Sequence, residues 1–183
     1  KLSDVVESLR YRRIVHITGA RQSGKTTLAA NAPIDNVRRY TMDNDNLRET
    51  AGDNPIEFTE RKAGETLVID EIQKVPELLN AIKIHVDESP DRGQYLLTGS
   101  SSLDFMRKSA DSLAGRMHTV RLRTLTLGEI NGSPPSFLDD AFRCEFKQPA
   151  AMIGKRDIIH QAFMGGYPET IGFPDSVRRD WYE

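Results

Sequence analysis

Cysteine is nearly absent from this chain, since Cys144 is the single one among 183 residues. One thiol cannot form an intramolecular disulfide, and it cannot supply the paired thiolates of a structural zinc site. The apolar runs are all far shorter than a membrane span, and no basic-then-apolar leader opens the sequence. These absences favour a reducing compartment. We expect a cytoplasmic protein with no membrane partner.

Charge of one sign is not in excess either. The 25 Lys and Arg residues nearly balance the 27 Asp and Glu residues, which leaves a net charge of −2. No global field therefore attracts nucleic acid or an anionic membrane. The sequence also lacks internal repeats, and its 38% hydrophobic and 28% charged residues are an ordinary globular balance. The length suits one α/β domain with a small appendage.

A glycine-edged loop is the most informative feature that the sequence does contain. It runs from Gly19 to Thr26, follows the apolar stretch 14–17 and precedes a helix-forming run. A strand, a loop of this spacing and a helix form the phosphate-binding loop. Gly19 and Gly24 allow a tight turn whose N–H groups point at phosphate oxygens, and the helix N-terminus adds the positive end of its dipole. The alternative is a chance match in a glycine turn before an ordinary helix.

Two side chains of the loop carry specific chemistry. Lys25 offers a compact positive charge to the β- and γ-phosphates of ATP, which also makes it a candidate catalytic residue. Thr26 offers a hydroxyl to Mg²⁺. The residues predicted to bind the nucleotide are Gly19, Ala20, Arg21, Gln22, Ser23, Gly24, Lys25, Thr26 and Thr27.

A second element consists of an apolar run that ends in two adjacent carboxylates, Asp70 and Glu71. A continuous apolar run is typical of a strand buried on both faces. Because the C-terminal ends of parallel strands face the ligand crevice, we expect Asp70 to lie beside the loop and to hold Mg²⁺ directly or through water. Glu71 is then placed to activate a water molecule against the γ-phosphate. The alternative is a strand that simply ends at the solvent.

The order of elements predicts the fold. Strands are expected at 14–17, 37–42, 66–71, 94–98 and 117–122, and helices at 54–64, 76–86, 103–113, 155–164 and from 175 onward. Strands that alternate with helices predict a five-stranded parallel sheet covered on both faces. We expect a nucleotide-binding core over 1–130 and a linker with a partial helical lid over 131–183. The start at Lys1 and the aromatic pair Trp181 and Tyr182 suggest a piece of a longer protein.

These motifs together resemble those of the AAA+ ATPases. More narrowly, the chain is similar to a prokaryotic group of uncharacterised ATPases with a further C-terminal domain. The resemblance rests on "GARQSGKTTL" from Gly19, "LVIDEIQKVPELL" from Leu67, "YLLTGSSSL" from Tyr95, "SLAGR" from Ser112 and "GGYPE" from Gly165. It implies a three-layer P-loop NTPase fold of AAA+ type, with ATP and Mg²⁺ as ligands.

The resemblance also implies roles for residues outside the loop. Ser100, or Ser101 beside it, takes the place of the polar sensor that touches the γ-phosphate or the attacking water. Arg116 takes the place of the arginine finger that is supplied to a neighbouring subunit, which implies a homo-oligomer. A surface arginine at a helix C-terminus is the alternative.

The motif "GGYPE" resembles the glycine-proline turn through which helical lids of related signalling ATPases approach the nucleotide. Contact of residues 166–168 with the nucleotide is one interpretation, and an ordinary turn is the other. Neither Arg178 nor Arg179 can be assigned as a second sensor in the lid.

Three functions are compatible with the sequence. The first is Mg-dependent ATP hydrolysis that serves as a conformational switch. The second is a module that binds nucleotide with little turnover and recognises a protein or nucleic acid through a further C-terminal domain. The third is a small-molecule kinase built on the same loop, although Glu71 favours water as the phosphoryl acceptor. Turnover of ATP without an added acceptor distinguishes the first from the third.

Overall fold

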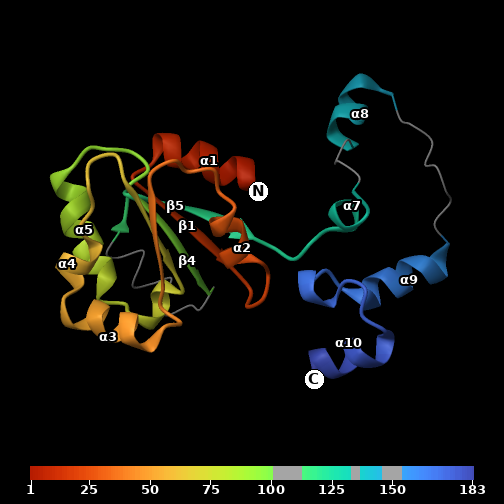
Figure 1. The fold of residues 1–183 in the computed structure, drawn as a ribbon. Coiled ribbons are helices and arrows are strands. Elements are labelled where there is room, and N and C mark those ends of the chain that lie inside the picture. Colours follow the sequence, from red (N-terminus) through yellow and green to blue (C-terminus); the bar gives the residue numbers. More distant parts are fainter. Residues whose placement is uncertain (101–112, 133–136, 146–153) are drawn as a thin grey trace. The chain divides into compact units, whose positions relative to one another are not determined.

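Five parallel strands form the sheet of the first part of the chain, in the order β2-β3-β4-β1-β5. The computed structural model describes residues 1–100, 113–132, 137–145 and 154–183. The strands are β1 (Ile14–Gly19), β2 (Val37–Thr41), β3 (Thr66–Asp70), β4 (Tyr95–Ser100) and β5 (Met117–Leu122). Figure 1 shows them at the centre of this unit, and the predicted five-stranded parallel α/β fold is confirmed.

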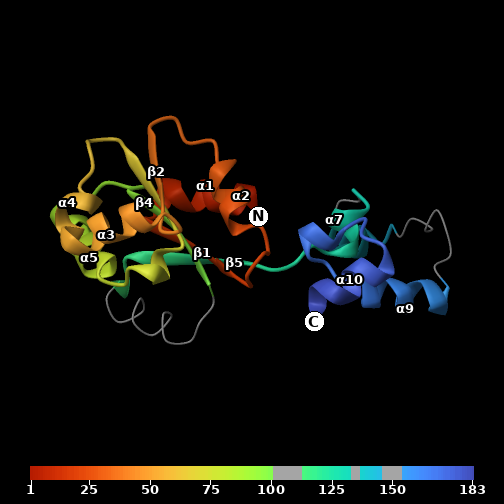
Figure 2. The same ribbon diagram turned by 60° about the horizontal axis from the view of Figure 1, so that its bottom comes forward.

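Helices cover both faces of this sheet (Figure 2). One face packs against α1 (Leu2–Tyr11) and α2 (Lys25–Ala30), through a core that includes Val5, Ile17 and Ala29. The other face packs against α3 (Asp45–Asp53), α4 (Pro55–Thr59), the short 3₁₀ helix η1 (Ile72–Lys74) and α5 (Leu78–Glu88). Because both faces are covered, the central strands β1 and β3 are buried along their whole length.

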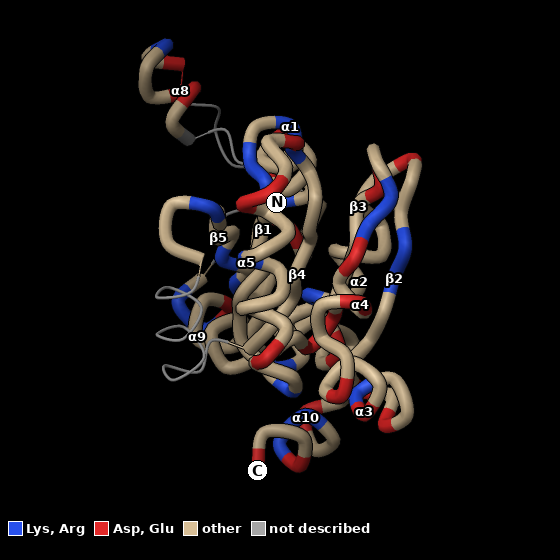
Figure 3. Tube along the Cα trace, turned by 90° about the vertical axis from the view of Figure 1, so that its left-hand side faces the viewer, with Lys and Arg blue, Asp and Glu red and all other residues tan. Residues whose placement is uncertain are grey.

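The edge strands are more polar than the central ones. Both β2 and β5 keep partly exposed side chains. Basic and acidic positions are interspersed along the tube of this unit, which agrees with the near-balanced net charge (Figure 3). The described residues contain no helix that is long and apolar enough to cross a bilayer.

The chain divides into two compact units, Lys1–Arg123 and Thr124–Glu183. The second unit contains α7 (Leu127–Ile130), α8 (Phe137–Arg143), α9 (Lys155–Met164), the 3₁₀ helix η2 (Pro168–Thr170) and α10 (Asp175–Tyr182). The aromatic pair at its end does have a partner, since the rings of Trp181 and Tyr182 lie 5.1 and 6.0 Å from the ring of Tyr167.

Two helix boundaries differ from the predictions. The helix expected over 54–64 ends at Thr59, because Glu60 is extended and its carbonyl accepts a hydrogen bond from Arg38. The helix expected from Pro76 begins at Leu78, after a turn in which the N–H of Leu79 donates to the Pro76 carbonyl at 3.1 Å. The predicted helix 103–113 lies almost wholly outside the described residues.

Candidate functional site

The predicted phosphate-binding loop connects β1 to α2, as expected. Gly24 caps α2 with a φ of 91°, a left-handed conformation that costs glycine nothing and most residues a good deal. Gln22 also has a positive φ, of 61°. The chain therefore turns sharply within the loop and enters the helix at Lys25. The first turn of α2 then presents N–H groups that have no partner within the helix.

Gly19 is required for a reason that the sequence does not reveal. A Cβ atom built at this position would lie 2.3 Å from the carbonyl oxygen of Leu122 on β5. Gly19 and Leu122 are register partners in the parallel pairing of β1 with β5. The absence of a side chain thus lets the edge strand pass close to the start of the loop.

The Ala20 carbonyl holds the interior of the loop together. It accepts hydrogen bonds from the Lys25 ammonium and the Ser23 hydroxyl, both at 2.8 Å. The Lys25 side chain is nearly buried, with 5% of its surface exposed. The Lys25 side chain thus folds back over the loop and bonds to its second residue. Arg21, by contrast, is exposed.

Asp70 and Thr26 meet at the end of the loop. The Thr26 hydroxyl lies 3.0 Å from each carboxylate oxygen of Asp70, although the two residues are 44 positions apart. The hydroxyl of Thr98, on β4, donates to Oδ1 of the same carboxylate. Asp70 is buried. The expected proximity of Asp70 to the loop is confirmed, and Thr98 adds a contact that orients the carboxylate.

Glu71 follows β3 in a left-handed conformation, with a φ of 57°. Its backbone N–H donates to the Thr98 hydroxyl oxygen at 3.1 Å. Its carboxylate accepts a hydrogen bond from the Gln73 side-chain amide. The oxygen of that amide accepts from the backbone N–H of Ser100 at 3.3 Å. Glu71 is therefore connected to the end of β4 through both its main chain and its side chain.

Ser100 lies next to the loop, because it is the register partner of Gly19 in the pairing of β1 with β4. The loop thus lies with Asp70, Glu71 and Ser100 at one end of the strands. This is the C-terminal end of all five parallel strands. Ser101 lies outside the described residues.

His16 is the titratable residue most affected by this environment. It lies in the middle of β1 and has 2% of its surface exposed. Burial lowers the pKa of its imidazole from 6.5 to about 4, and the positive charge of Lys25 adds to the effect. His16 is therefore neutral at physiological pH.

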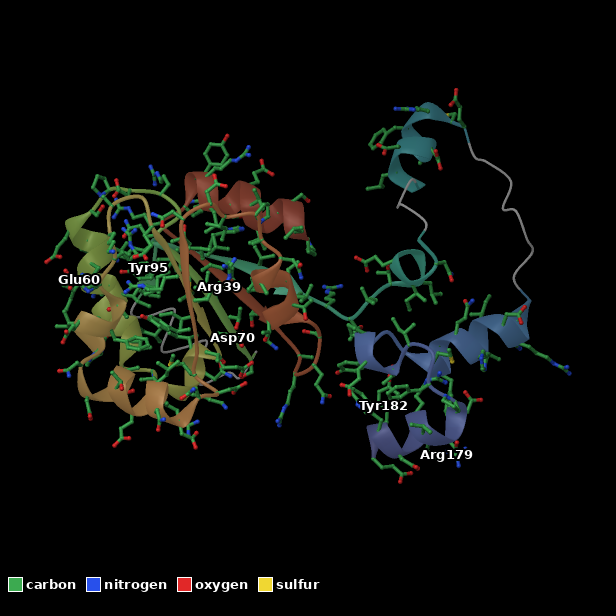
Figure 4. The ribbon with its side chains drawn as sticks, in the orientation of Figure 1. Arg39, Glu60, Asp70, Tyr95, Arg179 and Tyr182 are labelled. Carbon is green, nitrogen blue, oxygen red and sulfur yellow. The ribbon has the colours of Figure 1, made fainter. Side chains whose placement is uncertain are left out.

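The structure places Arg116 away from the C-terminal ends of the strands. β5 begins at Met117, opposite Ile14, and reaches the loop only at Leu122. At about 3.3 Å per residue, five residues of strand correspond to roughly 16 Å. Figure 4 labels Asp70, at the C-terminal end of β3, and Tyr95, at the N-terminal end of β4. Arg116 lies at the N-terminal ends of the strands, with Tyr95.

At the N-terminal ends of the strands, Arg116 forms a two-point ion pair with Asp87. Its Nε and Nη2 atoms lie 2.5 and 2.9 Å from the two carboxylate oxygens. The pair lines a cavity of about 290 Å³ together with Arg12, Arg13, Arg92 and residues 114–115. The hydrogen bonds from Arg116 hold the pKa of the Asp87 carboxyl below its ordinary value. Arg116 is therefore half-buried and paired at the end of the strands that is remote from its own loop.

The glycine-proline turn lies in the second unit. The Leu125 N–H donates to the Gly166 carbonyl at 2.7 Å, and a Cβ atom at Gly166 would lie 2.1 Å from the Leu125 oxygen. The turn borders a cavity of about 610 Å³ that is also lined by Arg178, Arg179 and Tyr182. Figure 4 labels the last two on α10. Arg178 is buried and bonds to Asp175 at 2.7 Å and to the Phe173 carbonyl.

Comparison with known proteins assigns the family. A family model described as AAA domain matches residues 11–131, which is more than half of the chain. The chain belongs to the AAA domain family. The predicted resemblance to AAA+ P-loop ATPases is therefore confirmed, and membership indicates nucleotide binding and hydrolysis as the general activity of such a domain.

Two curated proteins are similar to this AAA domain, uncharacterized proteins of Mycobacterium bovis and of Mycobacterium tuberculosis. Each is 32% identical over 150 residues, a match that covers 70% of this chain. The chain spans about one third of the length of either relative, 33%. Among solved structures, that of a DNA replication initiation factor covers 88% of this chain and 57% of its own, with 11% identity and a TM-score of 0.47.

The AAA domain offers a fitting place for Mg²⁺. A hydroxyl and a carboxylate are hard oxygen donors, which Mg²⁺ prefers, and this ion commonly takes only one or two protein ligands beside phosphates and water. Thr26 and Asp70 supply such a pair. Among the described residues, no three or more His, Cys, Asp or Glu side chains cluster so that they could hold a metal ion.

Thr98 was missed by reasoning from the sequence, whereas Gln73 was considered there as a residue that could orient water, with the opening of the next turn as the alternative. Thr98 contacts Asp70 and Glu71, and Gln73 contacts Glu71 and Ser100. The signal for Thr98 was its position near the end of a predicted strand, where polar side chains face the crevice. The signal for Gln73 was its spacing of two from Glu71, which by itself also fits the opening of a turn.

Proposed function

We propose that this AAA domain binds Mg·ATP and hydrolyses it, and that turnover serves as a conformational switch. The observation that carries the proposal is the contact of Thr26 with both oxygens of Asp70, in the loop where the buried Lys25 side chain bonds to the Ala20 carbonyl. These groups come from the loop and from a second strand, and they provide a hydroxyl, a carboxylate and a positive charge at one point. That set suits the phosphates of a nucleotide and its metal ion.

Each residue of the site then has a defined task. Residues 19–27 bind the phosphates through backbone N–H groups, and Lys25 compensates the charge of the β- and γ-phosphates. Thr26 and Asp70 hold Mg²⁺. The bound ion neutralises charge that develops on the transferred phosphoryl group.

Glu71 performs the step that makes the domain a hydrolase. It accepts a proton from water as the water oxygen attacks the γ-phosphorus, and the bond to the β–γ bridging oxygen breaks so that ADP leaves. Ser100 contacts the γ-phosphate at the end of β4. The position of Ser100 beside Gly19 supports this role.

Arg116 acts on the site of a neighbouring copy. It lies at the N-terminal ends of the strands, whereas its own loop lies at their C-terminal ends. It can therefore serve as an arginine finger only in a homo-oligomer. The glycine-proline turn of the second unit acts as part of a lid on the nucleotide. A protein or nucleic-acid target is recognised by a further domain of the whole protein, which is expected to be cytoplasmic.

Release of phosphate from Mg·ATP, measured with no added acceptor, tests this function. We expect steady release that requires the metal ion and is lost in Lys25→Ala. Binding of ATP without release would instead support a nucleotide-binding module. Transfer of phosphate only when a small-molecule acceptor is supplied would support a kinase. Both outcomes would contradict the proposal.

A further inference from the structure

We propose that Gln73 is a positioning residue for hydrolysis, which ties the carboxylate of Glu71 to the C-terminal end of β4. The inference rests on the proposed function, because it concerns how the water-activating group of that same site is held. Gln73 belongs to η1, and within the described part of the chain its side-chain amide bonds to Glu71 and Ser100 rather than to the loop or Asp70. Its part in the reaction is therefore exerted through Glu71.

The orientation of the Gln73 amide is determined by its two partners. The Glu71 carboxylate can only accept a hydrogen bond, so it must face the amide NH₂. The Ser100 backbone N–H can only donate, so it must face the amide oxygen, which lies 3.3 Å away. A flipped amide would place oxygen against oxygen and N–H against N–H. Gln73 thus has one arrangement that satisfies both neighbours, and this arrangement fixes their separation.

The fold makes room for this bridge at Gly99. A Cβ atom at that position would lie 2.8 Å from the Gln73 amide oxygen, closer than side-chain carbons approach. The amide therefore crosses β4 at the point where the strand has no side chain. Gly99 is buried, and Gln73 itself is half-buried. In such a partly desolvated place, a hydrogen bond to a charged carboxylate is stronger than it would be in water.

A second tie makes the position of Glu71 depend on β4. The Glu71 backbone N–H donates to the Thr98 hydroxyl, and the residue has a φ of 57°, which is unfavourable for a side chain of this kind. The Glu71 main chain is thus held at Thr98, and its carboxylate is held through Gln73 at Ser100. Both anchor points lie within the last three residues of β4.

The coupling follows from this arrangement. Ser100 pairs in register with Gly19, so the end of β4 lies beside the phosphate-binding loop. A movement of Ser100 toward a γ-phosphate displaces the N–H to which the Gln73 amide is bonded, and the amide displaces the Glu71 carboxylate. Gln73 therefore reports the presence of the γ-phosphate to the residue that activates water.

The test uses Gln73→Ala, Gln73→Glu, Glu71→Gln and the double variant Glu71→Gln with Gln73→Ala. ATP affinity is measured by titration calorimetry and kcat by phosphate release. We expect both Gln73 variants to bind ATP with parental affinity and to lose roughly tenfold or more in kcat, less than the ~100-fold or greater loss from removing the base itself. The Gln73→Glu variant has nearly the shape of the parent, but its new carboxylate opposes that of Glu71. A role in packing alone predicts parental kcat for it.

The double variant decides whether Gln73 acts through Glu71. In that case Gln73→Ala causes no further loss of kcat once Glu71 is already Gln, because the two effects are not additive. Lys74→Ala, in the same turn, is the control and keeps parental kcat. Additive losses, or parental kcat in both Gln73 variants while Glu71→Gln is slow, would overturn the inference. Parental kcat in Glu71→Gln would instead refute the catalytic role of Glu71 in the proposed function.

Discussion

The Thr26 hydroxyl contacts both carboxylate oxygens of Asp70, at 3.0 Å each. The first residue comes from the opening turn of α2 and the second from the end of β3, so the contact joins a crossover helix to the end of a strand. Thr98 bonds to the same carboxylate from β4. Three adjacent elements thus determine where a metal-binding carboxylate lies relative to the phosphate-binding loop.

Replacing Lys25 by Ala should abolish ATP binding or weaken it by orders of magnitude. The β- and γ-phosphates then lose the compact positive charge that lies across the loop. Titration calorimetry with Mg·ATP measures the effect, and Lys62→Ala, which removes an exposed lysine outside the loop, serves as the control. Unchanged affinity in the Lys25 variant would contradict the assignment of the loop.

Replacing Glu71 by Gln should leave Mg·ATP affinity nearly unchanged and slow hydrolysis by about 100-fold or more, since the amide keeps the shape but cannot accept the proton of water. Single-turnover measurements with radiolabelled ATP separate this step from product release. The variant should retain ATP that the parent converts to ADP. Hydrolysis at the parental rate would remove the role of Glu71.

Replacing Asp70 by Asn should raise the Mg²⁺ concentration needed for half-maximal turnover by about 10–100-fold. The amide has no charge and cannot hold the ion as the carboxylate does. Phosphate release measured across a magnesium titration gives the midpoint. Asp43→Asn, an exposed carboxylate beyond the end of β2, is the matched control and should keep the parental midpoint. An equal shift in both variants would show that the effect is general.

Replacing Arg116 by Ala should leave ATP binding intact and lower kcat, by up to the roughly 10³–10⁵-fold that an arginine finger contributes. Mixing this variant with Glu71→Gln should restore part of the activity. A mixed oligomer contains sites where the intact Glu71 of one copy meets the intact Arg116 of the next. Activity is measured as a function of the mixing ratio at concentrations that assemble the protein.

Two outcomes of that experiment would count against the arrangement. Parental kcat in the single variant would remove Arg116 from catalysis. A slow variant without rescue would argue against action between copies, since a residue that serves only its own site cannot be complemented. Arg48→Ala, which removes another exposed ion pair of the first unit, is a control for general effects of charge.

His16 should make stability depend on pH. Its folded-state pKa is about 4, below the ordinary value of 6.5, so the unfolded chain binds more protons between these two values. Stability is therefore fully present above pH ~6.5 and falls as the pH drops toward 4. The loss is about 3 kcal/mol, at 1.36 kcal/mol per pKa unit.

Urea unfolding at several pH values checks this prediction against His16→Gln, which cannot titrate in this range. The parent should lose stability more steeply than the variant between pH 6.5 and 4.5. Carboxylates titrate in both proteins, so the difference between the two slopes isolates the histidine. Identical slopes would show that His16 gains no proton on unfolding.

Local patterns in the sequence determined much of the fold. The helix over 155–164 and the strand over 117–122 have the bounds that the sequence predicts. Apolar spacing is a property of consecutive residues, so it can be recognised without the fold. The loop from Gly19 to Thr26 was recognisable for the same reason, since its glycines, lysine and hydroxyl must stand at fixed offsets. The closeness of Asp70 to that loop followed from a general property of parallel sheets.

Tertiary structure alone decided the contacts between segments that are remote in the sequence. Gly19 meets the Leu122 carbonyl only because β5 pairs beside β1, and Arg116 meets Asp87 only because α5 ends near the start of β5. The Gln73 amide reaches Ser100 only because β3 and β4 are neighbours. The sequence by itself therefore determined which residues carry the chemistry of phosphate binding. Strand order and packing determined which residues hold them, because these depend on pairings across the whole sheet rather than on local spacing.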